Sequence, residues 1–140
     1  MTACDACLRR TALVALLAPH VERGRRDRRK LREMLSLPDT RLIEALAGDR
    51  GPAIRRAHAS FDAARARERL LAASMHAVCR HDPRYPPRML EAGDAPAILH
   101  VAGDVGRLAA LADRDAPAVA VVGARGAGAD GIEVARCLGR

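Results

Sequence analysis

Ala118-Val-Ala-Val-Val122, Gly123-Ala-Arg-Gly-Ala-Gly-Ala-Asp-Gly131 and Ile132-Glu-Val-Ala-Arg-Cys-Leu138 follow one another near the end of the chain. The first segment is short, apolar and rich in β-branched residues, which indicates a buried parallel strand. The second segment contains too much glycine to continue a strand or a helix. The third segment resumes apolar residues at helical spacing. This order of strand, glycine turn and helix predicts backbone N–H groups and a helix N-terminus directed at an anion.

The glycine turn contains a fixed positive charge. Arg125 can hold a phosphate with two parallel hydrogen bonds. The predicted phosphate-binding residues are Arg125 and its turn neighbours Gly123, Ala124, Gly126 and Gly131. The alternative is a structural arginine that binds nearby backbone carbonyls. Ligands of open α/β sheets usually bind at the carboxyl ends of parallel strands, which favours the phosphate role.

The same glycines also satisfy a dinucleotide-binding pattern. Residues 126–131 match G-x-G-x-x-G. However, the first glycine after the predicted strand is Gly123, and the acidic residue expected about 20 positions later would fall beyond Arg140. The sequence has no Gly-Lys-Ser/Thr, which a P-loop needs. We therefore predict no NAD(P), FAD or other cofactor.

The first half of the chain has a helical pattern. Apolar periodicity predicts helices over residues 8–18, 31–35 and 40–47, and a longer helix that begins at Gly51-Pro52 and extends to Leu71. Short helices with tight turns are typical of small SAM-like or helix-hairpin-helix-like modules, some of which bind DNA backbones. Residues 1–74 are therefore predicted to form a helical N-terminal domain.

The second half alternates strands and helices. Strands are predicted over residues 76–79, 98–101 and 118–122, with short helices at 88–91 and 105–111. This alternation implies a parallel sheet with right-handed crossovers. The predicted fold class is thus α/β, with the first βα units of a Rossmann-like parallel sheet over residues 75–140. Three strands would leave edges exposed, so we expect a truncated domain and a longer natural protein.

Charge is distributed unevenly along the 140 residues. The net charge is +7, and the excess of basic residues lies within residues 1–80. An anionic polymer is one partner that fits this distribution; arginines dispersed over solvated helix faces are the alternative. No run of 18 uncharged apolar residues occurs, so no membrane span is predicted. The N-terminus lacks the layout of an export signal, which favours a cytoplasmic location.

Four cysteines raise the question of a metal site. Cys4-Asp-Ala-Cys7 has the spacing of zinc ligands, and Cys79 with His81 would complete a set of four. A single C-x-x-C is weak evidence for a zinc site unless a second pair of ligands has the spacing of a zinc knuckle. Cys79 and His81 do not have that spacing. The favoured interpretation is therefore buried or incidental cysteines, with no metal site. The remaining histidines have no acid or nucleophile at a spacing typical of a catalytic site, so no catalytic residues are predicted.

Three motifs in order carry a family resemblance. They are Asp82-Pro-Arg-Tyr-Pro-Pro-Arg-Met-Leu90, Asp94-Ala-Pro-Ala-Ile-Leu-His-Val-Ala-Gly103, and Val119-Ala-Val-Val-Gly-Ala-Arg125 with Gly131. The trio resembles the DNA-processing protein A (DprA/Smf) family, whose pattern runs D-x-x-Y-P-x-x-L, D-x-P-x-x-L-x-x-x-G and V-G-[ST]-R with a later glycine. The resemblance is specific over residues 82–131.

The resemblance implies a cytoplasmic, non-catalytic protein that binds single-stranded DNA and loads the RecA recombinase in natural transformation. It also implies an extended Rossmann-like domain and a homodimer in the full-length protein. Arg125 matches the arginine of the DNA-binding pocket, and Gly123 and Gly131 match the glycines that shape its turn. Ala124 stands where the family usually has Ser or Thr, so one hydroxyl donor to phosphate is lost.

A second class of function remains open at this point. Similar Rossmann-like domains with a Gly-x-Arg turn include phosphoribohydrolases that act on nucleoside monophosphates. The tyrosine-proline motif around Tyr85 and the basic helical half favour the DNA-binding protein. A catalytic glutamate and a second glycine-rich loop would favour the enzyme.

Overall fold

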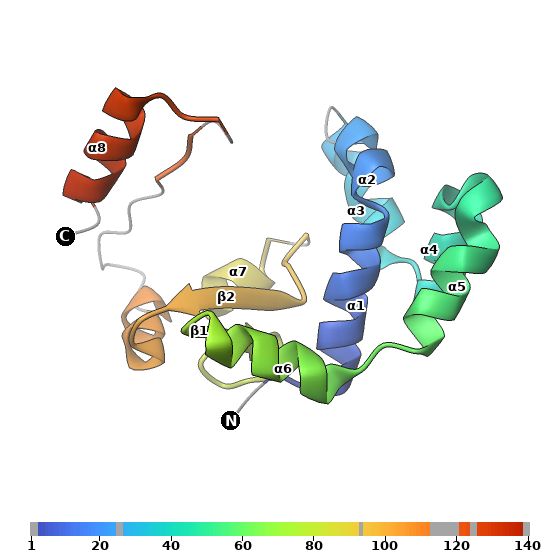
Figure 1. Cartoon of the computed structure of the whole chain (residues 1–140), viewed down its shortest axis with the longest axis horizontal. Coiled ribbons are helices and arrows are strands. Elements are labelled where there is room, and N and C mark those ends of the chain that lie inside the picture. The colour runs from blue at the N-terminus through green and yellow to red at the C-terminus, as the bar shows by residue number, and fades with distance from the viewer. Residues whose placement is uncertain (1–2, 25–26, 93, 113–120, 124–125, 139–140) are drawn as a thin grey trace.

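The computed structural model describes residues 3–24, 27–92, 94–112, 121–123 and 126–138. The fold is mixed α/β, mostly helical with one small sheet (Figure 1). In chain order its elements are α1 (Asp5–Leu16), α2 (Ala18–Gly24), α3 (Arg28–Ser36), α4 (Asp39–Leu46), the 3₁₀ helix η1 (Gly48–Arg50), α5 (Gly51–Ala59), α6 (Ala63–Ala72), β1 (Met75–Cys79), α7 (Pro87–Leu90), β2 (Ile98–Ala102), the 3₁₀ helix η2 (Val105–Ala112) and α8 (Ala129–Leu138).

The predicted long helix after Gly51 is wrong, because the chain forms two helices there. α5 ends at Ala59, and α6 begins at Ala63. The Asp62 side chain accepts a hydrogen bond from the backbone N–H of Arg65, which is the usual N-cap arrangement. Because Asp62 caps a new helix, α5 and α6 are separate, even though the spacing of apolar residues continues across the break between them.

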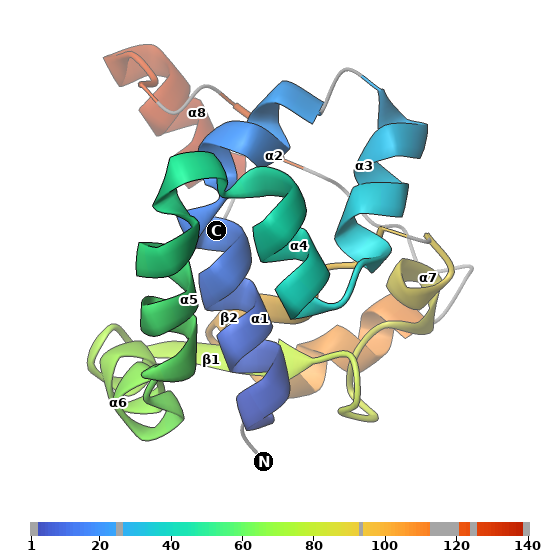
Figure 2. The same cartoon turned by 90° about the vertical axis from the view of Figure 1, so that its right-hand side faces the viewer.

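One core cluster lies among the helices of the first half. α1 packs against α5, and α5 packs against α4 (Figure 2). The cluster is built from aliphatic side chains that are almost fully buried: Leu13, Leu17, Leu42, Ile43, Ala47 and Ile54. Their helical spacing places one apolar face of each helix inward. The predicted helical character of the first half is confirmed.

A polar network ties the same helices together beside this cluster. Arg10 of α1 donates to the carbonyl oxygens of Leu35 and Leu37 at the end of α3, over 2.6 and 3.0 Å. It also pairs with Asp39, the first residue of α4, at 2.7 Å. The second Asp39 oxygen lies 2.9 Å from Nε2 of His58 in α5. The Arg10 side chain is only 15% exposed, so these bonds are partly shielded from water.

The sheet is antiparallel, which corrects the predicted parallel arrangement. β1 and β2 form a two-stranded sheet in which Met75 pairs with Ala102 and Cys79 with Ile98. Parallel pairing needs a crossover of about a dozen residues or more that returns to the start of the strand, usually as a helix. Among the described residues between these strands, the one helix is the single turn α7, and the loop reverses direction instead.

That loop is held by buried polar and aromatic side chains. Asp82 is 6% exposed; its carboxylate accepts from the backbone N–H of Arg84 and from its guanidinium, over 2.7–2.9 Å. Tyr85 is 2% exposed, and its hydroxyl donates to the carbonyl oxygen of Pro96 at 2.7 Å. Tyr85 therefore pins the returning segment just before β2.

A second core cluster joins the N-terminal segment to the sheet. Its buried members come from α1 and the residue before its N-cap, from β1 and from the start of β2: Ala3, Cys7, Leu8, Ala77, Cys79, Ala97 and Ile98. Phe61, Ala63 and Leu70 pack against it from the α6 side. The chain thus brings residues 3–8 against the strand that begins at Met75.

The described residues between 121 and 138 belong to neither core cluster. Val121 and Val122 belong to no strand, and residues 118–120 of the predicted third strand lie outside the described residues. Figure 1 shows α8 apart from the other helices. Its side chains are exposed throughout the helix. No helix in the described part of the chain is long and apolar enough to span a membrane.

Candidate metal centre

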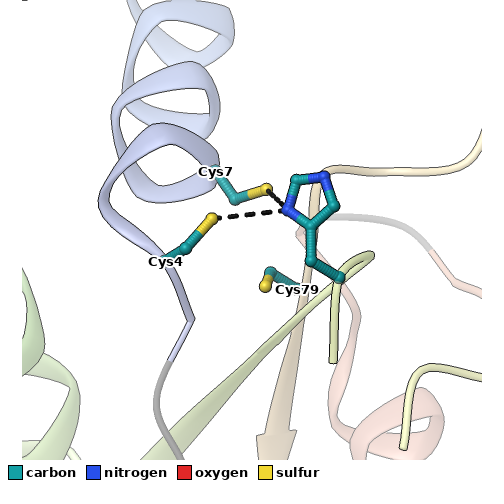
Figure 3. Close-up of side chains that lie close together, drawn as sticks. Cys4, Cys7 and Cys79 are labelled. Carbon is teal, nitrogen blue, oxygen red and sulfur yellow. Dashed lines mark hydrogen bonds between the residues drawn. The ribbon is translucent and has the colours of Figure 1, made fainter. Parts of the chain in front are cut away.

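Three cysteines and one histidine, far apart in the sequence, converge at the junction between α1 and β1. Cys4, Cys7 and Cys79 gather around one imidazole ring (Figure 3). The ring belongs to His81. The three sulfurs and one imidazole nitrogen all lie within 4.8 Å of one another.

The start of α1 positions the first two sulfurs. Cys4 is the N-cap of the helix, with extended backbone angles, and Cys7 lies in its first turn. Residues three apart at this position project toward the same side. The segment is anchored by Arg67 of α6, whose guanidinium donates to the carbonyl oxygen of Ala3 at 2.7 Å and pairs with Asp5.

The end of β1 positions the other two groups. Cys79 is the last residue of the strand, and a tight turn follows, closed by a 2.8 Å hydrogen bond from the N–H of Asp82 to the carbonyl oxygen of Cys79. The turn directs His81 back toward α1. Its Nδ1 lies 3.5 Å from the sulfur of Cys4 and 3.5 Å from that of Cys7. Cys7 and Cys79 are buried, Cys4 is half-buried, and His81 is exposed.

The cluster holds its thiols in unequal environments. Burial is the main cause that raises the pKa of Cys7 to about 12, and a hydrogen bond with Cys4 is the next largest. Burial also acts to raise the pKa of Cys79, but backbone hydrogen bonds from Cys4 and His81 outweigh it and lower that pKa. Backbone N–H groups directed at a sulfur stabilise its thiolate form, which is the form that binds metals.

The sequence favoured buried or incidental cysteines, and Cys7 and Cys79 are buried, but it did not predict that all four residues converge. The two halves of the cluster are separated by more than seventy positions, and Cys79-x-His81 is not a paired-ligand spacing that sequence rules recognise. The available signal was the co-occurrence of C-x-x-C with a third cysteine that lies two positions before a histidine. Only the fold shows that α1 and the end of β1 meet.

The predicted phosphate turn is only partly described. Ala124 and Arg125 lie outside the described residues, so their predicted contacts stay predictions. Gly123 and Gly126 are exposed, and a Cβ on either would meet nothing within 4 Å. Gly131 lies inside the first turns of α8 rather than in a loop. Among the described residues, no sheet edge supports this turn.

The comparison with protein families bears on the second half of the chain. Residues 76–140 match the family model described as DNA recombination-mediator protein A. The match covers somewhat less than half of the chain and includes the strands, the loop containing Tyr85 and the glycine turn. It confirms the DprA resemblance and connects this region with DNA processing in recombination. Neither a curated protein nor a solved structure gives a significant match.

Proposed function

We propose that this chain belongs to a non-catalytic accessory protein that binds single-stranded DNA during recombination. On this proposal it acts in the cytoplasm, delivers the strand to a RecA recombinase during natural transformation, and forms a homodimer when full length. The match of residues 76–140 to the DNA recombination-mediator family carries the proposal. The alternative, a nucleotide-processing phosphoribohydrolase, has no support from that match.

Exposed arginines on α5 and α6 support binding to a polyanion. Arg55 and Arg56 on α5, and Arg65 and Arg69 on α6, are all exposed. Arg65 and Arg69 are one helical turn apart and share a face of α6. Within the described residues no acidic side chain pairs with any of the four, whereas Arg41 on α4 pairs with Glu44 at 3.0 Å. Unpaired arginines attract phosphates without reading the sequence of bases.

The glycine turn is the proposed phosphate-binding element. Arg125 would supply a bidentate contact to one phosphodiester, and the turn glycines Gly123 and Gly126 allow the backbone to approach it. Tyr85 does not supply a base-stacking surface, because it is buried and its hydroxyl is bound to Pro96. Affinity on this proposal is therefore mainly electrostatic and depends on salt.

An anisotropy titration of labelled single-stranded DNA at several salt concentrations tests this proposal. Arg125→Ala should weaken binding and reduce the slope of log K against log salt concentration by about one. Arg136→Ala, which removes an exposed arginine of α8 outside the turn, is the matched control and should keep the wild-type slope.

The outcomes separate the two basic regions. An Arg125→Ala slope equal to that of the wild type would rule out the phosphate contact. If Arg55→Ala/Arg56→Ala alone reduces binding, the helices of the first half carry the affinity instead. A wild-type chain that binds no DNA at low salt, or one that hydrolyses nucleoside monophosphates, would contradict the proposed function.

A further inference from the structure

We propose that Cys4, Cys7, Cys79 and His81 form a structural zinc site that fastens the start of α1 to the end of β1. The proposal stands apart from DNA binding, because none of the four residues lies in the predicted phosphate turn. It rests on the convergence of four ligand atoms within 4.8 Å.

The distances fit a tetrahedral site. Zinc lies about 2.3 Å from a cysteine sulfur and about 2.0 Å from a histidine nitrogen, so tetrahedral angles separate the two ligand atoms by about 3.5 Å. The Nδ1 of His81 lies 3.5 Å from the sulfurs of both Cys4 and Cys7. Small local adjustments can therefore bring all four atoms to one ion.

The geometry distinguishes this site from a pair of buried thiols. Buried cysteines in an apolar core behave as small hydrophobic side chains and need no polar partner. Here an imidazole nitrogen lies 3.5 Å from two sulfurs at once, and the third sulfur lies within 4.8 Å of all three of these atoms. A disulfide between two cysteines would leave the third sulfur and His81 without a role in the cluster.

The donor set selects the metal and its role. Three sulfurs and one imidazole are soft and borderline ligands, which suit Zn²⁺ and exclude Mg²⁺ or Ca²⁺ as the natural occupant. Four protein ligands fill a tetrahedral zinc ion and leave no position for water or substrate. The ion would therefore stabilise the fold and perform no chemistry.

The position of the site explains why the fold would benefit from it. The adjacent core cluster consists largely of small side chains, including Ala3, Ala77 and Ala97. Small cores contribute little free energy of folding, and metals commonly supplement them. An ion bound by residues 4 and 7 and by residues 79 and 81 closes a long loop of the chain, and its binding free energy becomes part of the folding free energy.

Elemental analysis of the full chain, purified under reducing conditions from zinc-containing medium, is the first test. The expected result is about one zinc per chain. Titration of the metal-free chain with Co²⁺ should give the visible d–d bands of tetrahedral cobalt and thiolate-to-cobalt charge transfer. Substoichiometric zinc together with no cobalt spectrum would overturn the proposal, whatever the variants show.

Variants locate the ligands. Cys79→Ser should lose zinc, with a greater loss of affinity than the roughly 10–100-fold that follows removal of an outer-shell partner. Cys137→Ser, which removes the exposed cysteine of α8, is the matched control and should keep one zinc. His81→Cys should also keep it, with a cobalt spectrum shifted by the fourth thiolate. Equal zinc loss in Cys137→Ser, or a Cys4–Cys7 disulfide in the reduced wild type, would refute the assignment.

Discussion

The described parts of residues 75–102 and of residues 121–138 both lie largely within the same family match, yet the first region buries large side chains and the second leaves them exposed. The first region buries Val78, Tyr85 and Ile98 to 4% exposure or less. In the second, Val122 is 89% exposed and Leu138 is 64% exposed. The first region is therefore held by its own packing, whereas the described residues supply no packing partner for α8.

The comparison shows what each motif requires. Side chains hold the loop from Asp82 to Tyr85. Asp82 binds Arg84 two positions along the chain, and Tyr85 binds Pro96 eleven positions along. The glycine turn works through backbone N–H groups, and such groups point at a ligand only when a sheet and a helix fix the turn between them. A glycine pattern in the sequence is therefore not enough by itself to predict such a site.

The largest expected difference is in the cost of removing a leucine side chain. Leu42→Ala removes a side chain that is fully buried in the α1–α4–α5 cluster, and should reduce the free energy of unfolding by about 2–5 kcal/mol. Leu138→Ala makes the same chemical change in α8 and should change it by less than about 0.5 kcal/mol. Urea denaturation followed by circular dichroism measures both.

The same two variants can also contradict the difference in packing between the two regions. A Leu138→Ala cost close to that of Leu42→Ala would mean that α8 packs against something in solution. Analytical ultracentrifugation of the wild type would then show whether a second copy of the chain supplies that partner.

The next largest effect concerns arginines. Arg10→Met keeps the length of the side chain but removes its bonds to Leu35, Leu37 and Asp39. Charge-assisted bonds that are partly shielded from water contribute about 1.5–3 kcal/mol, so the loss of stability should fall in or slightly above that range. Arg136→Met in α8 should be neutral to within about 0.5 kcal/mol. Similar losses in the two variants would show that the Arg10 network is too exposed to matter.

Local patterns in the sequence predicted local structure well. Apolar periodicity located α1, α3 and α4, and the strands predicted at residues 76–79 and 98–101 coincide with β1 and β2. Such signals act within a few residues. The burial of Tyr85 between prolines was also predictable, since a lone tyrosine in a turn-rich loop needs a partner for its hydroxyl.

Long-range pairing was not predictable in the same way. The alternation of strands and helices suggested parallel pairing, but strand direction depends on how the chain between Cys79 and Ile98 returns, which no periodicity reports. The convergence of Cys4, Cys7, Cys79 and His81 was not predictable for the same reason. These residues form two separate pairs in the sequence, and their ligand atoms come within 4.8 Å of one another because α1 meets the end of β1.

The smallest expected effect is a pH dependence that separates the two regions. Partial burial acts to raise the pKa of Asp39, but hydrogen bonds with Arg10 and His58 outweigh it and hold the pKa below its usual value of 3.8. A carboxylate with a lowered pKa stabilises the fold fully above its unfolded-state pKa, and this stabilisation is lost as the pH falls through the folded-state pKa. Wild type should therefore lose more stability than Asp39→Asn between pH 5 and pH 3, measured by urea denaturation at each pH.

Asp130→Asn, in the first turn of exposed α8, should follow the wild-type curve, and acid release of any bound metal affects all three proteins alike. If Asp39→Asn also follows that curve, the carboxylate is not held in its charged form by Arg10 and His58, and the network does less for the packed region than its geometry indicates.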